Sequence, residues 1–231
     1  MRFLVGGAMA LGLLSAAGSV SAQVTYNFQG GLYNSIINGG ACVVGECATF
    51  TAADRANASI TFAAPLAPNL TNVDVSAQIT AYSFSNGVTS TVGPGPNAAI
   101  YQALVTTDAG GTLTNYSILL ERTPGPPYPV GDPADANSRW SYVAFTPSSG
   151  NAYANAVCLA RFAPAAVSGP GACGNIFIDA GTSIGGASTP TTFSLVTPTP
   201  TVPTLSEWAM ILFALLLAGG AAVVIQQRRT A

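Results

Sequence analysis

The chain has 231 residues, of which 49% are hydrophobic and only 7% are charged. It contains no histidine and no lysine, and its net charge is −2. A disordered chain would be poor in apolar residues and rich in charge, so this composition predicts a folded protein. The region from Gln23 to Glu207 contains four arginines and nine acidic residues, so the sequence predicts no basic surface for nucleic acid.

Residues 1–22 have the pattern of a secretory signal peptide. Arg2 supplies the positive start, Phe3–Leu14 is the apolar run, and Val-Ser-Ala at 20–22 is a small-residue site for a signal peptidase. We therefore expect an exported protein whose mature form begins at Gln23. The alternative is an uncleaved N-terminal anchor, but the apolar run is short for a membrane span.

The sequence pattern of residues 23–196 predicts a β-rich extracytoplasmic domain. Apolar and polar side chains alternate in short stretches bounded by Gly, Pro and Asn, and no window of ten residues has a helical stripe. We expect nine or ten short strands in an antiparallel β-sandwich or jelly roll. The predicted strands are Val24–Phe28, Ile60–Phe62, Val73–Phe84, Val88–Val92, Ile100–Thr107, Thr112–Glu121, Ser138–Thr146, Val157–Phe162, Ile176–Ile178 and Phe193–Val196.

Three local signals refine this pattern. The alternation changes phase at Tyr82, which predicts a β-bulge near Ala81. Asn86-Gly87 predicts a two-residue hairpin turn, and Asp108–Gly111 predicts a second turn. The stretches 84–87 and 107–118 also resemble the strand-turn and hairpin motifs of ectodomains on PEP-CTERM-type proteins, with Tyr116 in place of tryptophan. That resemblance supports the β-fold alone.

The four cysteines lie in this exported region. An even number of cysteines in an oxidising compartment predicts disulfides. Three pairings are possible, and the simplest one joins sequence neighbours, Cys42 with Cys47 and Cys158 with Cys173. A metal site is the alternative, but the chain lacks histidine and paired Cys-x-x-Cys knuckles, so we expect neither a metal nor another cofactor.

The composition also limits catalysis. Without histidine or lysine, the Ser-His-Asp, Cys-His, Ser-Lys and Schiff-base mechanisms are excluded. Paired carboxylates could still serve a glycosidase, but most acidic residues adjoin turns, where Asp caps the backbone. We therefore expect a protein that is not an enzyme. The acidic residues of the domain are Glu46, Asp54, Asp74, Asp108, Glu121, Asp132, Asp135 and Asp179.

Two stretches could bind a ligand. Asp132–Asn137 offers three oxygen ligands, but it lacks a calcium-loop pattern, so a solvated acidic turn is the preferred interpretation. Trp140 and Tyr142 share one strand face and could form an aromatic platform for a sugar together with Tyr128. Packing into the core is the more common role of such residues.

The C-terminal residues read as a linker and a membrane helix. A Pro/Thr linker at 197–203 predicts a semi-rigid spacer of about 20 Å. Ala209–Ile225 has no charge, and with Trp208 it covers about 27 Å as a helix, enough for a bilayer core. Trp208 suits the outer interface and the terminal arginines favour the cytoplasmic side, so we expect the domain outside. A buried core helix is the alternative, but the segment is apolar all round.

Residues 202–231 combine a short motif, the helix and a basic tail. They resemble the IPTL-CTERM sorting domain of Gram-negative bacteria, which is related to PEP-CTERM signals, with Val202 in place of Ile and Ala209 in place of Gly. The resemblance implies handling by an exosortase-like membrane transpeptidase, whereas an ordinary tail anchor is the alternative. Pro203 lacks a backbone donor, so we expect the motif to stay extended before the helix. The residues that carry the signal are Val202, Pro203, Thr204, Leu205, Trp208, Arg228 and Arg229.

The sequence therefore favours an exported, non-catalytic protein of the bacterial cell surface or extracellular matrix, anchored and then processed through its C-terminus. A carbohydrate-binding module delivered by the same route, with exopolysaccharide as its partner, is the second hypothesis. A hydrolase that uses carboxylates is the third. An exposed row of aromatic residues would favour the second, and an acidic pair across a cleft would favour the third.

Overall fold

A computed structural model describes residues 23–124, 128–162, 171–196 and 205–230. The chain divides between Thr197 and Pro198 into a β-domain and a C-terminal helical segment. The predicted signal peptide, the linker and the first three motif residues, Val202–Thr204, lie outside the described residues.

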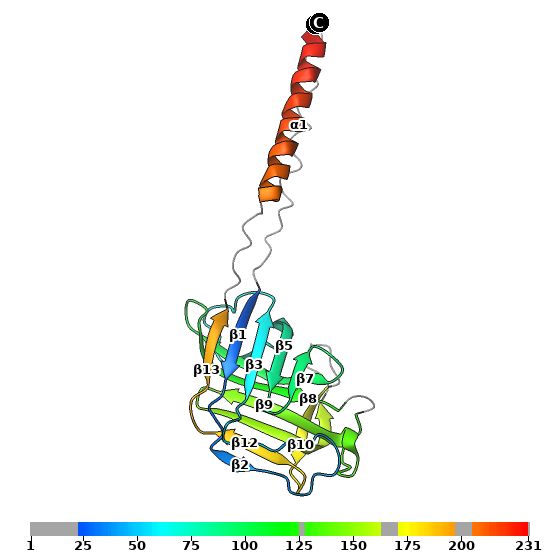
Figure 1. Cartoon of the computed structure of the whole chain (residues 1–231). Coiled ribbons are helices and arrows are strands. Elements are labelled where there is room, and N and C mark those ends of the chain that lie inside the picture. The colour runs from blue at the N-terminus through cyan, green and yellow to red at the C-terminus, as the bar shows by residue number, and fades with distance from the viewer. Residues whose placement is uncertain (1–22, 125–127, 163–170, 197–204, 231) are drawn as a thin grey trace. The chain divides into compact units, whose positions relative to one another are not determined.

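The β-domain consists of two antiparallel sheets, and the strands of one run across those of the other (Figure 1). The strands of the five-stranded sheet follow one another in the order β13 (Thr192–Val196), β1 (Val24–Gln29), β3 (Asn57–Phe62), β5 (Ile79–Ser85) and β6 (Ser90–Gly93). Seven strands of the eight-stranded sheet follow one another in the order β2 (Ser35–Ile37), β12 (Ser183–Ala187), β10 (Ser149–Phe162), β9 (Arg139–Thr146), β8 (Leu113–Arg122), β7 (Ala98–Thr107) and β4 (Val73–Asp74). The eighth strand of this sheet, β11 (Ala172–Phe177), lies outside this order and pairs with β10. The predicted antiparallel, all-β class is confirmed.

The core lies between the two sheets, and the alternation of apolar residues builds it. Phe28 of β1 is 2% exposed, and its ring lies 5.1 Å from that of Tyr116 and 6.0 Å from that of Phe145 in the opposite sheet. Ile60 and Leu120 are fully buried on the same inner faces. Burial of each large apolar side chain contributes about 1.5–3 kcal/mol, so this layer is the main source of stability.

The prediction of one continuous strand from Val73 to Phe84 is wrong. A short 3-10 helix, Ser76–Gln78, separates β4 from β5, and the two strands belong to different sheets. Asp74 causes the break, because its Oδ1 accepts hydrogen bonds from the backbone N (2.9 Å) and hydroxyl (2.6 Å) of Ser76. The predicted bulge is confirmed, since Ala81 pairs with Thr61 and Ile79 with Phe62, and Thr80 is left over.

The hairpin turn after β5 exists, but it is centred one residue later than predicted. Ser85 pairs with Ser90, so Gly87 and Val88 form the tip. Gly87 adopts a φ of +99°, and Asn86 Oδ1 accepts hydrogen bonds from the N–H groups of Val88 and Thr89 at 3.0 and 2.8 Å. In the second turn, Asp108 Oδ1 accepts from Gly110 and Thr112 at 2.8 Å each, as expected for a capping aspartate.

Three strand regions were not predicted, namely β2, β12 and the first half of β10. The sequences of β12 and of the first half of β10 are rich in Gly, Ala and Ser, which carry little apolar signal, and β2 (Ser-Ile-Ile) is only three residues long. The small residues are needed for close packing. A Cβ at Gly185 would lie 2.6 Å from the buried ring of Tyr33.

Candidate functional site

The aromatic residues singled out in the sequence do not form an exposed platform. Trp140 and Tyr142 share the outer face of the eight-stranded sheet, but Trp140 is only 1% exposed. It packs against the cysteines of the Cys158–Cys173 disulfide together with Tyr128 and Ile176. Core packing is therefore its role, and Tyr142 stacks on Tyr153 instead, with ring centroids 4.4 Å apart.

Two disulfides join sequence neighbours, Cys42 to Cys47 and Cys158 to Cys173, and no described cysteine is free. The second disulfide closes the connection between β10 and β11 and holds β11 over Trp140. The first lies beside Asn155, whose Nδ2 donates to Val44 O (3.0 Å) and Gly181 O (3.2 Å). Among the described residues, no cluster of His, Cys, Asp or Glu suits a metal ion.

Glu121 is the most unusual carboxyl of the β-domain. It lies on the outer face of the eight-stranded sheet, it is 2% exposed, and its Oε2 accepts a 2.6 Å hydrogen bond from Cys173 N. Burial raises the pKa of Glu121 to about 8, against the opposing effect of that hydrogen bond. It borders a hollow of about 180 Å³ that Tyr101 and Tyr142 also line.

The other carboxyls of the β-domain hold its loops. Arg139 donates to both oxygens of Asp179, at 3.1 and 2.6 Å, and lowers the pKa of that carboxyl to about 2. The same guanidinium donates to the backbone of Pro133, so it ties the 131–138 loop to the sheet. Glu46 pairs with Arg122, and Asp54 accepts from Thr51.

The acidic stretch 132–137 is a capped turn. Asp132 Oδ1 accepts from Ala134 N and Asp135 Oδ1 from Asn137 N, each at 2.8 Å. Each carboxyl of the described β-domain thus has a hydrogen-bond or ion-pair partner within the fold, as listed for Glu46, Asp54, Asp74, Asp108, Glu121, Asp132, Asp135 and Asp179.

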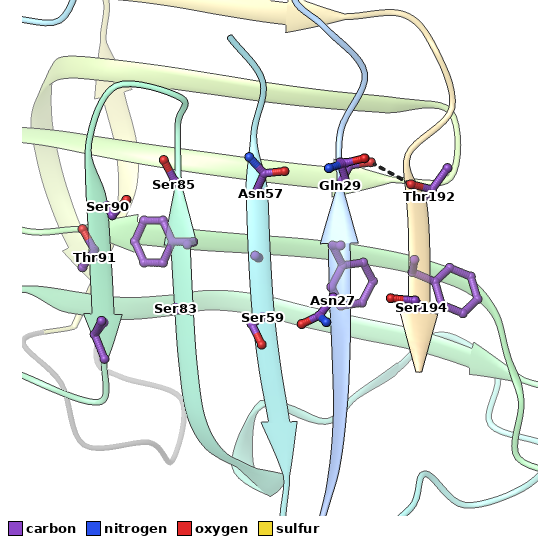
Figure 2. A pocket seen from close by; sticks show the side chains of 15 residues that line it. Asn27, Gln29, Asn57, Ser59, Ser83, Ser85, Ser90, Thr91, Thr192 and Ser194 are labelled. Atoms are coloured by element: carbon purple, nitrogen blue, oxygen red, sulfur yellow. Dashed lines mark hydrogen bonds between the residues drawn. The ribbon is translucent and has the colours of Figure 1, made fainter. Parts of the chain in front are cut away.

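A site that sequence reasoning missed lies on the outer face of the five-stranded sheet (Figure 2). The sheet is hollowed there, with a volume of about 570 Å³. Strand register places the outward side chains in two rows that cross all five strands. One row is Thr192, Gln29, Asn57, Ser85 and Ser90, and the other is Ser194, Asn27, Ser59, Ser83 and Val92. We call these ten residues the polar face.

Nine of the ten residues of the polar face carry a hydroxyl or amide group, the tenth is the exposed Val92, and none is charged. Few of these groups are used by the fold. Asn57 Nδ2 donates to Arg55 O, Ser85 Oγ accepts from Gly87 N, and Thr192 Oγ1 donates to Gln29 O at 3.5 Å. Among the described residues, no hydrogen bond engages the other six polar side chains, which are those of Asn27, Gln29, Ser59, Ser83, Ser90 and Ser194. Exposed strand positions usually carry charged residues as well, so the choice of Ser, Thr, Asn or Gln at nine of these ten positions is the signal that could have revealed this face.

The C-terminal segment contains one long helix, α1 (Leu205–Thr230). The helix begins four residues earlier and ends five residues later than the predicted 209–225. Leu205–Trp208 is therefore helical, so the expectation that the whole motif is extended is wrong. The added residues, such as Glu207 and Gln226–Arg229, contain no Gly or Pro and favour a helix.

Within α1, Ile211–Arg229 is long and apolar enough to cross a membrane, with a mean hydropathy of 1.7 and none of it buried in the protein. Arg228 and Arg229 lie in its last turn. By length and composition, such a helix with terminal arginines is a candidate membrane span.

Residues 201–229 match the IPTL-CTERM motif, so the chain carries a C-terminal sorting signal of that family. The match covers Val202–Leu205, the helix and the arginine pair, and it leaves the β-domain outside. No curated protein and no solved structure matches the chain.

Proposed function

We propose that the chain is an exported, non-catalytic protein of the bacterial cell surface or extracellular matrix. Its C-terminal helix anchors a precursor in the membrane, and an exosortase-like transpeptidase then processes it at the IPTL-CTERM motif. The observation that carries this proposal is the coincidence of the motif, an apolar helix and an arginine pair in residues 201–229.

Each part has a physical task in this proposal. The helix holds the motif at the outer membrane interface, where an enzyme embedded in the same bilayer can reach it. Arg228 and Arg229 fix the depth, because a charge at the bilayer centre costs about 3 kcal/mol or more. The β-domain acts by structure or adhesion, since every carboxyl described there already has a partner in the fold.

The test measures whether the C-terminus of each variant is trimmed in a host that contains the sorting enzyme. Pro203→Ala with Thr204→Ala should leave membrane insertion intact and stop trimming, so that only the anchored precursor appears on immunoblots of cell fractions. Replacing Arg228 and Arg229 by Gln is the comparison variant, because it should instead let the tail slip through the bilayer and blur the topology. Normal trimming of the Pro203/Thr204 variant would reduce the segment to an ordinary tail anchor.

A further inference from the structure

The polar face lies on a sheet whose inner side already completes the core. Its side chains therefore do not hold the sandwich together, and six of the polar ones (Asn27, Gln29, Ser59, Ser83, Ser90 and Ser194) have no hydrogen-bond partner among the described residues. A hollow of about 570 Å³ falls within the range of small-molecule and oligomer sites in proteins. These observations indicate a binding surface.

The chemistry of the hollow selects its ligand. Its lining combines ten Ser, Thr, Asn and Gln residues with Phe28, Ala58, Phe84, Val92 and Phe193, and none of these residues is charged, so the hollow offers no ion pair to an anionic or a cationic partner. Serine, threonine, asparagine and glutamine each present both a donor and an acceptor. A ligand that is rich in hydroxyl groups, each also a donor and an acceptor, is the complement of such a surface.

The spacing favours an extended ligand that crosses the strands. Ser194, Asn27, Ser59 and Ser83 occupy cross-strand positions on four neighbouring strands. Neighbouring strands lie about 4.8 Å apart, which is close to the length of one pyranose unit in an extended chain. Successive sugar units could therefore meet equivalent side chains (Figure 2).

We propose that the polar face binds a neutral polysaccharide laid across the strands of the five-stranded sheet. The second row, with Gln29 and Asn57, contacts the same chain from the side. Because none of the ten residues of the polar face is aromatic, affinity comes mainly from many weak neutral hydrogen bonds, and it grows with the length of the glycan. This proposal does not depend on the sorting of the protein.

The test is affinity electrophoresis of the full chain in a detergent without a sugar head group. The probes are barley β-glucan, dextran and galactomannan as neutral polymers and alginate as an acidic one. At least one neutral polymer should retard the protein, and alginate should not. Retardation by alginate alone, or by none of the polymers, would overturn the proposal.

The variant Asn27→Ala/Ser59→Ala/Ser83→Ala removes the central groups of one row and should weaken binding about tenfold or more. The control Thr25→Ala/Thr61→Ala/Thr80→Ala lies on the same sheet outside the hollow and should bind like the parent. Equal losses in both variants would contradict the assignment. Light scattering adds one more outcome: a dimer that only the first variant dissociates would assign the face to a second copy instead.

Discussion

The two outer faces of the sandwich differ in what covers them. On the eight-stranded sheet, β11 and the Cys158–Cys173 disulfide lie over Trp140 and bury Glu121. On the five-stranded sheet, the polar face has no comparable cover within the described residues, and its side chains are small and uncharged. Both sheets bury their inner faces in one core, so the outer faces are free to differ. One outer face adds to stability, and the other remains accessible to a ligand.

The largest expected effect is on the outer face of the eight-stranded sheet around Trp140 and Glu121, which we call the covered face. Trp140→Ala should lower the free energy of unfolding by about 3–5 kcal/mol, because it empties a fully enclosed site beneath β11. Equilibrium denaturation in urea with the disulfides intact measures the change. A loss below 1 kcal/mol would mean that β11 does not seal this face.

Trp140→Phe is the matched control. It keeps most of the apolar contact and removes the indole Nε1, which is buried without a hydrogen-bond partner in the described structure. Because an unpaired buried donor costs free energy, this variant should lose much less than the alanine variant.

The disulfide over the covered face should have the next effect. Replacing Cys158 and Cys173 by Ala removes a link across 15 residues and should cost about 3 kcal/mol in the chain-entropy model. Replacing Cys42 and Cys47, which are separated by 5 residues, should cost less, about 2 kcal/mol. Denaturant midpoints of the two double variants give the order, and the reverse order would show that the second disulfide adds little to this face.

Glu121 makes the covered face sensitive to pH. Burial raises its pKa to about 8 from an ordinary value of 4.5, so the neutral form is favoured in the folded state. Its stabilising contribution is therefore complete below about pH 4.5 and is lost as the pH rises through about 8. We expect a loss of about 2 kcal/mol, less than the full shift would give at about 1.4 kcal/mol per pKa unit, because water can enter the adjacent hollow as the carboxyl ionises.

Glu121→Gln tests this. Glutamine keeps an acceptor for Cys173 N and cannot ionise, so its unfolding free energy should stay flat over the range in which that of the parent falls. Urea titrations at pH 5, 7 and 8.5 compare the two proteins. Parallel curves would show that another group is responsible for the pH dependence.

The sequence predicts the covered and inner parts of the molecule better than the exposed face. Alternation at Val24, Tyr26 and Phe28 identifies a strand with one buried side, because burial selects residue type strongly. The cysteine count and the C-terminal motif are similarly direct signals. Strands such as Ser183–Ala187 escape prediction because small residues there are chosen for close contact with Tyr33 and leave no apolar pattern.

The polar face escapes prediction for another reason. Ser59 and Ser83 are 24 positions apart in the sequence, and only the register of β3 on β5 makes them neighbours. The same holds for Asn27 and Ser194, which come from opposite ends of the domain. Local patterns can show that each residue points outward, but they do not show which outward residues meet.

The smallest expected effect on stability is on the polar face, and it tests most directly whether the two outer faces differ in their contribution to stability. Ser59→Ala with Ser83→Ala should change the free energy of unfolding by no more than about 0.5 kcal/mol, because neither hydroxyl bonds to the described fold. Ser59→Thr should be neutral or slightly stabilising, since a β-branched side chain suits a strand. Urea denaturation of the three proteins measures these differences. A loss of 2 kcal/mol or more in the double variant would mean that the polar face supports the sandwich and is not reserved for a ligand.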